Sequence, residues 1–417
     1  MTQKHFGYKS KNHFFTFLLC WTAYASTYIC RLNFSAAMPE LQANAVFSET
    51  RIAAVSSAFF ICYGIGQFVS GLIGDRADTR KLVFSGLLIS ALCNIGIFCA
   101  HTYAPLLLLW AANGIAQSMV WTPILKIASL NFDASTREKF GIDMSTTVPI
   151  GTLLSYAVSL LTLLFLPWQY VFLTCGLFEL FVSVIWMFGT RGRFRPKAEH
   201  PSADAQKTDI KNGLGNTFKA ALSGGVLLML IPIVIQGTLK DSVTQWVPAF
   251  FASTFGSDTS FSLLLTMLLP IVNVTGAYFA KAIHKKLHSE IGTSMIFFGI
   301  SIVFLLILKL FGTKSMALAL LSMAGVTNCM FAVNVMLITM VPLQFSTLGN
   351  VSTVGGLLNA VAYIGCGMLN LLAGRLLETQ NGWNSLFWLW IVLAAVAVTV
   401  SAVCIPMWKR FCKKNAE

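Results

Sequence analysis

Apolar runs of about twenty residues recur along this chain, and they constrain its fold more than any other feature. A bilayer core about 30 Å thick needs roughly 20 apolar residues per helix. Of the 417 residues, 56% are hydrophobic and 11% are charged, whereas soluble domains carry about 25% charged residues. A water-facing shell cannot be built from this composition. We therefore expect an all-α integral membrane protein.

Twelve membrane spans are predicted, in two groups of six separated by a polar stretch. They run near 14–39, 51–73, 82–101, 104–130, 142–166, 168–190, 222–250, 260–282, 291–311, 315–341, 348–376 and 385–407. The polar stretch, 191–219, is rich in Lys and Arg and predicts a cytoplasmic linker. The expected organisation is an N-terminal six-helix bundle (1–190), this basic linker, and a C-terminal six-helix bundle with a short cytoplasmic tail (220–417).

The excess of basic residues indicates membrane topology. Of the 29 Lys and Arg, 22 fall in the N-terminus, the linker, the C-terminal tail and the loops after the second, fourth and eighth spans. Cytoplasmic segments carry such an excess, so both termini are expected in the cytoplasm, with the chain in the cell membrane. We predict no nucleic-acid partner. The cysteines are scattered singly without a C-x-x-C pair, which predicts neither a metal site nor a disulfide framework, and no cofactor is expected.

The first span of each half carries the same pattern of a cation eight residues before a proline. Arg31 precedes Pro39, and Lys240 precedes Pro248. At 1.5 Å per residue the two cations lie about 12 Å from the outer helix ends, near the middle of the bilayer. A cation at that depth is costly unless it faces a cavity or a partner. We predict that both bind an anionic substrate. Asp241 follows Lys240 but lies about 100° round the helix, which argues against a simple ion pair.

Other polar residues inside the spans are weaker candidates. Tyr24 and Tyr28 share a helical stripe with Arg31 and can donate hydrogen bonds to an oxyanion. Lys126, near the cytoplasmic end of the fourth span, is a candidate for substrate binding or gating, although its long side chain can also reach the headgroups. Glu179 is the deepest acid of the first half, either paired or a proton site.

The loop after the second span reads Gly71-Leu-Ile-Gly-Asp75-Arg76-Ala-Asp-Thr-Arg80-Lys81. Asp75 with Arg76 and Arg80 can form a charge latch that is made in one conformation and broken in another. This Gly-x-x-x-Asp-Arg pattern resembles the signature of the major facilitator superfamily. The resemblance implies two six-helix bundles related by pseudo-twofold symmetry about an axis along the membrane normal.

A narrower resemblance covers most of the chain. The run Tyr24-Ala-Ser-Thr-Tyr28-Ile-Cys-Arg31-Leu-Asn33-Phe34-Ser-Ala-Ala37-Met38-Pro39 looks like the first helix of the organophosphate:phosphate antiporters, which exchange glycerol 3-phosphate or hexose 6-phosphate. Trp121-Thr-Pro123, Trp246-Val-Pro248 and Tyr363-Ile-Gly365 also have counterparts there. In that family cations of the first and seventh helices grip the phosphoryl group. The resemblance implies these roles for Arg31 and Lys240, and places Tyr363 on the wall of their cavity.

Several positions depart from that family. Gln67 stands where its glycerol-phosphate exchangers have a lysine, and we include it among the substrate-binding candidates. Their fifth-helix histidine falls near Ile150, and Lys240 replaces an arginine. The basic loop after the tenth helix is replaced by residues 342–349. These departures concern the substrate rather than the fold.

No protease, ATPase or hydrolase motif is present, so we do not expect an enzyme. The preferred function is a secondary transporter, expected to be a monomer, that exchanges a phosphorylated organic anion for inorganic phosphate. Two cations about 10 Å apart repel by about 1.7 kcal/mol at an effective dielectric of 20, and a bound dianion removes this penalty.

The first alternative is proton-coupled symport of an organic anion, with Glu179 or Asp241 titrating. The second is a membrane sensor with a transporter fold, which the ten-residue tail after Met407 disfavours.

Overall fold

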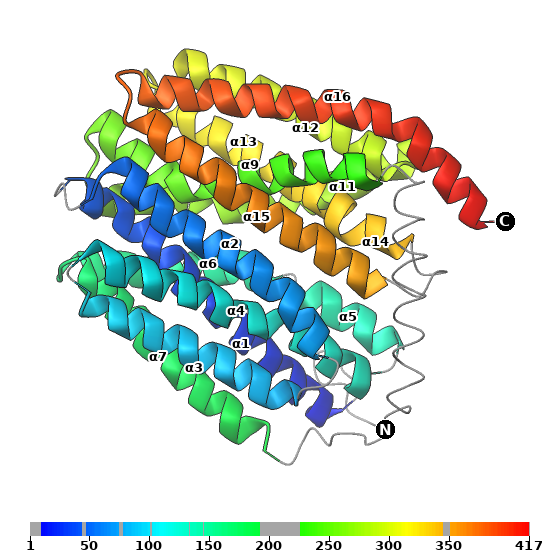
Figure 1. Cartoon of the computed structure of the whole chain (residues 1–417), viewed down its shortest axis with the longest axis horizontal. Helices are drawn as coiled ribbons and strands as arrows, with labels where there is room; N and C mark the ends of the chain where they lie inside the picture. The colour runs from blue at the N-terminus through cyan, green and yellow to red at the C-terminus, as the bar shows by residue number, and fades with distance from the viewer. Residues whose placement is uncertain are drawn as a thin grey trace. The chain divides into compact units, whose positions relative to one another are not determined.

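The computed structural model describes residues 10–43, 47–74, 78–100, 102–132, 134–144, 146–191, 226–344 and 351–416. These residues are helical almost throughout (Figure 1). The helices of the first half are α1 (Lys11–Ala43), α2 (Glu49–Gly74), α3 (Thr79–Phe98), α4 (Tyr103–Asn131), α5 (Ala134–Met144), α6 (Thr147–Leu163) and α7 (Gln169–Gly189). Those of the second half are α9 (Val226–Phe255), α10 (Thr259–Thr266), α11 (Leu268–Leu287), α12 (Glu290–Phe311), α13 (Met316–Asn334), the π-helix η1 (Val335–Met340), α14 (Val341–Leu343), α15 (Val351–Leu377) and α16 (Gly382–Ala416).

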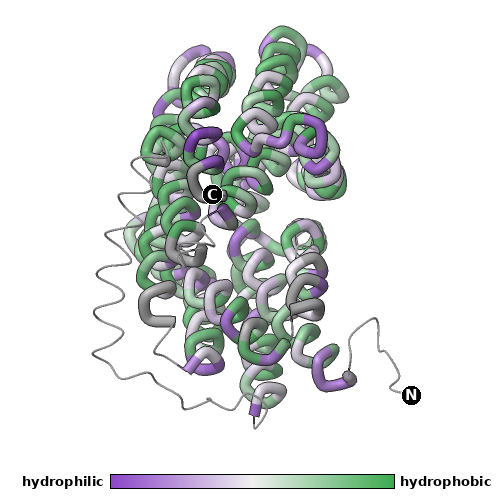
Figure 2. The backbone as a smooth tube through the Cα atoms, turned by 90° about the vertical axis from the view of Figure 1, so that its right-hand side faces the viewer, coloured by the Kyte–Doolittle hydropathy of each residue, from purple (hydrophilic) through white to green (hydrophobic). Residues whose placement is uncertain are grey.

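Each predicted span coincides with one or more of these helices, and the all-helical membrane fold is confirmed. Within the described part of the chain, nine segments are long and apolar enough to cross a bilayer. Hydrophobic residues run along most of the tube in Figure 2. Large apolar side chains such as Leu108, Phe165 and Met368 are more than half exposed. Lipid contact accounts for exposed residues of this kind.

The chain forms two compact units. The first holds the chain up to Pro196 together with Gln245–Pro270, and the second holds Lys197–Thr244 and Ile271–Glu417. The predicted linker, 191–219, lies outside the described residues from position 192 onward, so the bundle boundaries stay a prediction.

In the first unit, α4 packs against α2 and α3, α7 packs against α3, and α1 packs against α6 and α7. Small residues allow the close crossings. A Cβ on Gly114 of α4 would lie 2.5 Å from the carbonyl oxygen of Phe59 on α2. The segment 245–270 joins this unit through α1, because Ser35 Oγ donates to the Gln245 carbonyl at 2.7 Å. This packing brings α1, α3, α4 and α7 around one buried interior.

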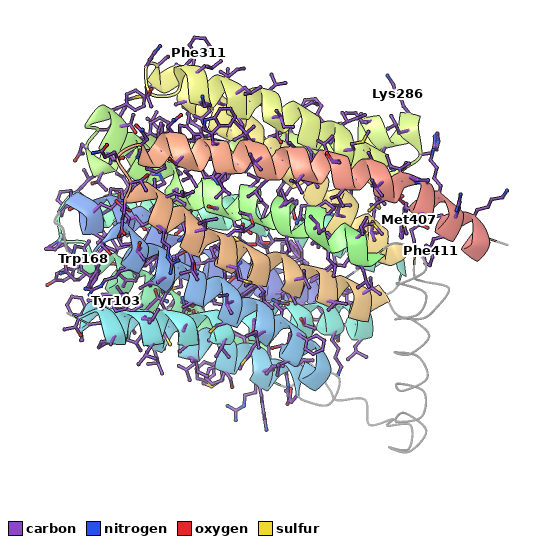
Figure 3. The ribbon with its side chains drawn as sticks, turned by 45° about the horizontal axis from the view of Figure 1, so that its top comes forward. Tyr103, Trp168, Lys286, Phe311, Met407 and Phe411 are labelled. Carbon is purple, nitrogen blue, oxygen red and sulfur yellow. The ribbon has the colours of Figure 1, made fainter. Side chains whose placement is uncertain are left out.

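In the second unit, α12 packs against α13 and α16. Figure 3 shows Lys286, at the end of α11, at the same end of this unit as Met407 and Phe411 of α16, with Phe311 at the opposite end. The loop after α11 and the end of α16 therefore lie on one side, as the count of basic residues requires.

Two predicted boundaries were wrong. The span expected over 142–166 falls on two helices, because α5 ends at Met144 and α6 begins at Thr147. The last helix does not end near 407 but continues to Ala416. Basic residues of the predicted tail are thus helical, and the apolar run marks only the part of α16 that a bilayer would cover.

Candidate functional site

Arg31 lies on α1 with its guanidinium among aromatic rings of α1 and α2. Its Cζ atom is 4.4 Å from the ring centroid of Tyr63, 4.8 Å from that of Tyr28 and 5.6 Å from that of Phe59. A cation within about 6 Å of an aromatic face is attracted by the ring quadrupole. Arg31 is only 8% exposed, so the cation lies inside the first unit.

A hydrogen bond from Arg31 to Gln117 of α4 orients the guanidinium. Arg31 Nε donates to Gln117 Oε1 at 3.0 Å, and Gln117 Nε2 donates to the Cys30 carbonyl at 3.1 Å. Gln117 was not among the residues predicted from the sequence. A signal was present, because Asn113 and Gln117 lie one turn apart in an otherwise apolar part of α4.

Tyr24 has a different environment from Tyr28, although both share the stripe with Arg31. The Tyr24 ring centroid lies 4.5 Å from that of Trp121 on α4 and 5.6 Å from that of Tyr28. Tyr24 therefore packs between Tyr28 and Trp121.

Gln67 is a buried amide on the same helix as Tyr63, one turn further along. It is 4% exposed, and its Nε2 atom has no hydrogen-bond partner within the described structure. A buried donor without a partner is costly. Its position one turn from the ring that contacts Arg31 makes it available to a ligand oxygen.

Lys240 of α9 belongs to the second unit. Its Nζ atom lies 3.4 Å from Asp241 Oδ2 and 5.7 Å from the ring centroid of Tyr363 on α15. The side chains of Lys240 and Asp241 are 21% and 24% exposed. The expectation that the helical angle keeps this pair apart was wrong, because the long lysine side chain reaches round the helix. The structure brings Tyr363 to Lys240, as the resemblance implied.

The loop after α2 is only partly described, since Asp75 and Arg76 lie outside the described residues. Arg80 pairs with Asp78, with Nη2 3.0 Å from Oδ2. Asp78 also caps α3 by accepting a hydrogen bond from the Arg80 backbone nitrogen. The hydrogen bond from the Arg80 side chain holds the pKa of Asp78 below its ordinary value. The charge latch predicted for Arg80 involved Asp75, and the pair with Asp78 was not predicted. Lys126 is half-buried on α4.

Glu179 of α7 is fully buried in the first unit. Its Oε2 atom lies 2.6 Å from Ser90 Oγ on α3, and Ser90 Oγ lies 3.4 Å from Gln117 Nε2. A chain of hydrogen-bonding groups therefore runs from Glu179 to the amide that orients Arg31. No Lys or Arg in the described ranges forms an ion pair with Glu179.

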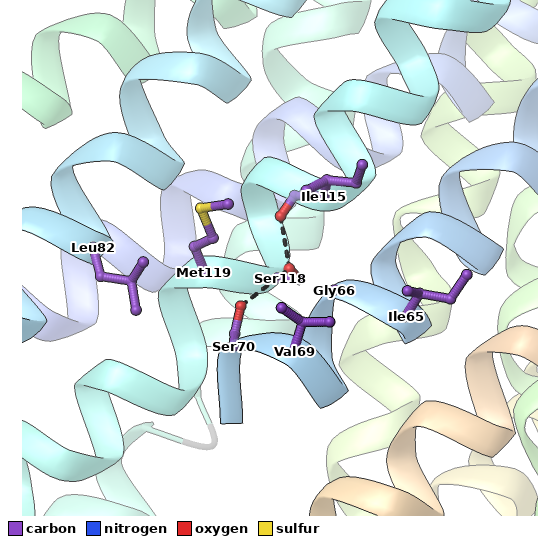
Figure 4. Close-up of a pocket in the computed structure, with 8 residues that line it drawn as sticks. All are labelled: Ile65, Gly66, Val69, Ser70, Leu82, Ile115, Ser118 and Met119. Carbon is purple, nitrogen blue, oxygen red and sulfur yellow. Dashed lines mark hydrogen bonds between the residues drawn. The ribbon is translucent and has the colours of Figure 1, made fainter. Parts of the chain in front are cut away.

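A small cavity of about 210 Å³ lies elsewhere in the first unit, among α2, α3 and α4 (Figure 4). Ser70 and Ser118, 3.5 Å apart, supply its hydroxyl groups. Apolar side chains that are more than two-fifths exposed, such as Ile65 and Ile115, line the rest. None of the predicted site residues lines it. This apolar surface crevice does not suit an anion. In the described ranges no group of three or more His, Cys, Asp or Glu residues could hold a metal ion.

The chain matches the Major Facilitator Superfamily over residues 20–369. It is 23% identical over 406 residues to the membrane sensor protein UhpC of Escherichia coli (strain K12), covering 93% of this chain and 90% of that protein. It is 24% identical over 257 residues to the glycerol-3-phosphate transporter of Bacillus subtilis (strain 168), and the match covers 58% of this chain and 57% of that protein. It is 32% identical over 128 residues to a probable hexose phosphate transport protein of Chlamydia muridarum (strain MoPn / Nigg), and the match covers 31% of this chain and 28% of that protein.

Solved structures show the same fold. A D-xylose-proton symporter aligns with a TM-score of 0.73 at 14% identity, covering 93% of this chain and 97% of that chain. A bacterial homolog of the human lysosomal transporter Spinster, inward-facing and unoccupied, aligns with a TM-score of 0.72 at 14% identity. The alignment covers 97% of this chain and 98% of that chain. The relatives named for hexose phosphate and glycerol 3-phosphate confirm the resemblance to the organophosphate:phosphate antiporters.

Proposed function

We propose that this chain, which belongs to the major facilitator superfamily, exchanges a phosphorylated small organic anion for inorganic phosphate by alternating access. It is a multi-pass membrane transporter and not an enzyme. The names of the sugar-phosphate and glycerol-phosphate relatives support a phosphorylated substrate. The exchange mode and the cytoplasmic placement of both termini are part of the proposal.

The observation that carries the proposal is the environment of Arg31. Three aromatic rings and the Gln117 amide hold the guanidinium in place. Together these groups fix the direction in which the guanidinium points. A planar guanidinium in fixed orientation suits two oxygens of one phosphoryl group. We propose that Arg31 binds the phosphoryl group in this way.

Lys240 supplies the second cation in this account. Its partner in the structure is Asp241, at 3.4 Å. An entering dianion competes with Asp241 for the ammonium group, and Tyr363 supports Lys240 through its ring. In the empty protein Lys240 is thus paired with Asp241, and a bound anion displaces that carboxylate. Gln67 is placed to donate to a further oxygen of the substrate.

A thermal-shift panel on the purified protein tests the substrate class. Inorganic phosphate, glycerol 3-phosphate and a hexose 6-phosphate should raise the melting temperature, because a ligand at 100 times its dissociation constant stabilises by about 2.7 kcal/mol. Carboxylates and free sugars should leave it unchanged. Arg31→Gln is the matched control, since it keeps a polar side chain with N–H donors and removes the charge. Stabilisation by carboxylates alone, or equal stabilisation of both proteins by phosphate, contradicts the proposal.

A sensor is the second candidate function, because the relative that covers 93% of this chain is a membrane sensor protein. A sensor binds its ligand without moving it. Phosphate-dependent stabilisation combined with no uptake into vesicles would favour the sensor over the transporter.

A further inference from the structure

A buried hydrogen-bond network joins four helices of the first unit. It consists of the Cys30 carbonyl and Arg31 on α1, Ser90 on α3, Asn113 and Gln117 on α4, and Glu179 on α7. Apart from Arg31, its side chains are at most 1% exposed. No bulk water reaches them, so each proton in the network must be accounted for.

Two groups of the network fix the direction of its hydrogen bonds. Arg31 Nε can only donate, so Gln117 presents its oxygen to Arg31. The Cys30 carbonyl can only accept, and it receives Gln117 Nε2 at 3.1 Å and Asn113 Nδ2 at 2.9 Å. Asn113 therefore turns its Oδ1 atom toward Ser90, at 2.6 Å.

Ser90 Oγ has one proton but two oxygen neighbours at 2.6 Å, Asn113 Oδ1 and Glu179 Oε2. The amide oxygen of Asn113 cannot donate, so the Ser90 proton goes to Asn113. If Glu179 were ionised, two oxygens without a proton between them would face each other at 2.6 Å. The proton between Ser90 Oγ and Glu179 Oε2 must therefore come from the Glu179 carboxyl.

The surroundings of Glu179 also disfavour a charge. Oε1 meets the geometric criteria for a hydrogen bond with no group of the described structure, and the Cys30 thiol beside the carboxyl is only a weak donor. Burying an ionised carboxylate with so few donors is expensive. The titratable groups that face this carboxyl are Arg31 and the Cys30 thiol on α1, Cys93 on α3, and Cys175 on α7 itself.

We propose that Glu179 is a neutral carboxylic acid that donates its proton to Ser90 and thereby positions Gln117 and Arg31. In this state Arg31 is the charged member of the network. Ionisation of Glu179 would turn the Ser90 hydroxyl proton from Asn113 to Glu179. It would also place a negative charge in the interior that holds Arg31. Glu179 is thus a positioning residue, and its effect on anion binding rests on the proposed function.

Glu290 of the second unit provides a contrasting buried glutamate. It is 6% exposed, and both of its oxygens accept from nitrogen donors: Oε1 from Gln344 Nε2 at 2.7 Å and Oε2 from Trp408 Nε1 at 3.0 Å. Neither contact requires a proton on the carboxyl. Glu290 therefore serves as the matched control.

Infrared difference spectroscopy of the purified protein tests the protonation state without any ligand. At neutral pH, wild type minus E179Q should show the carbonyl stretch of a protonated carboxyl, whereas wild type minus E290Q should show a carboxylate band. Loss of a carboxylate band in E179Q, with the protonated-carboxyl region unchanged, overturns the proposal.

Binding of inorganic phosphate tests the positioning role. Glu179→Gln keeps the size of the side chain and a donor for Ser90, whereas Glu179→Met keeps the size and loses the donor. We expect Glu179→Met to raise the phosphate dissociation constant about tenfold, as for one lost buried hydrogen bond, and Glu179→Gln to rescue most of this loss. The wild type should also lose affinity as pH rises through Glu179 ionisation, whereas the glutamine variant should not.

Equal weakening by both substitutions would overturn the positioning role. If phosphate binds neither the wild type nor the variants, the proposed function fails, and the infrared measurement still decides the state of Glu179.

Discussion

Two kinds of contact hold the Arg31 guanidinium, and a lysine could keep only one of them. An ammonium group can lie over the rings of Tyr28 and Tyr63. It has no planar fork with which to meet Gln117 and two phosphoryl oxygens together. The shape of the side chain therefore matters at this position as well as its charge.

We expect Arg31→Lys to raise the dissociation constant for a phosphomonoester by about tenfold or more, the scale of one charge-assisted hydrogen bond. The variant should still fold, because charge and volume are largely kept. Lys240→Arg should be milder, because the resembling family uses arginine there. Titration calorimetry on both variants measures the difference, and equal tolerance of the two changes would count against phosphoryl recognition at Arg31.

Asp241 competes with an anionic ligand for Lys240 in this account. Asp241→Asn should therefore tighten phosphate binding about two- to fivefold, since a partly exposed ion pair is worth about 0.2–1 kcal/mol. Asp143→Asn is the matched control, because it removes the same charge from the Lys139 pair on α5. Binding that weakens in the Asp241 variant, with uptake no longer following a pH gradient, would instead make Asp241 the titrating group of a symporter.

At the residue scale the sequence indicated isolated charges better than it indicated their partners. Arg31 and Lys240 stood out because a cation in an apolar run is costly. Gln117 did not, because an amide gains its role only once α4 lies beside α1. The Lys240–Asp241 pair was missed because a helical angle describes the Cβ directions and not the reach of a long side chain.

At the scale of elements, the crossing of α6 over α1 lies beside Tyr28, whose ring contacts Arg31. A Cβ on Gly151 would lie 2.7 Å from the Ala25 carbonyl oxygen and 2.8 Å from Tyr28 Cβ. The glycine therefore lets α6 pack against α1 at the level of a ring that contacts Arg31.

We expect Gly151→Ala to destabilise the protein by about 1–3 kcal/mol, the usual range for overpacking, and to weaken phosphate binding by displacing Tyr28. Gly299→Ala in α12 is the control, because a Cβ there meets nothing within 4 Å. That change should be neutral or stabilising by up to about 1 kcal/mol. Similar melting temperatures for the two variants would contradict the close crossing.

The helices themselves could be predicted because bilayer thickness sets the length of an apolar run. Two of their interruptions carry a proline signal that the predicted spans did not use. Pro149 and Pro270 are the third residues of α6 and α11, just after the breaks from α5 and α10, and a proline disfavours helical backbone before it. The π-helix Val335–Met340 likewise ends shortly before Pro342, although the proline alone does not predict the π-helical form.

At the scale of the whole molecule, the matching cation-to-proline spacings in the first helix of each half predicted the repeated architecture, and the superfamily match confirms the fold. The count of basic residues predicted that the loop after α11 and the C-terminal end of α16 lie on the same side of the membrane. Within their unit, these two ends lie together. Substrate and coupling mode depend on a few side chains rather than on the fold, so they stay proposals.

Exchange is the central claim, and counterflow in proteoliposomes tests it most directly. Vesicles preloaded with phosphate should take up labelled phosphomonoester about ten to a hundred times faster than vesicles loaded with a neutral osmolyte at equal pH. A penalty of about 1.4–2.8 kcal/mol for crossing without a bound anion corresponds to this ratio. Uptake that ignores internal phosphate, follows an imposed pH gradient and collapses with an uncoupler would contradict exchange and establish proton symport.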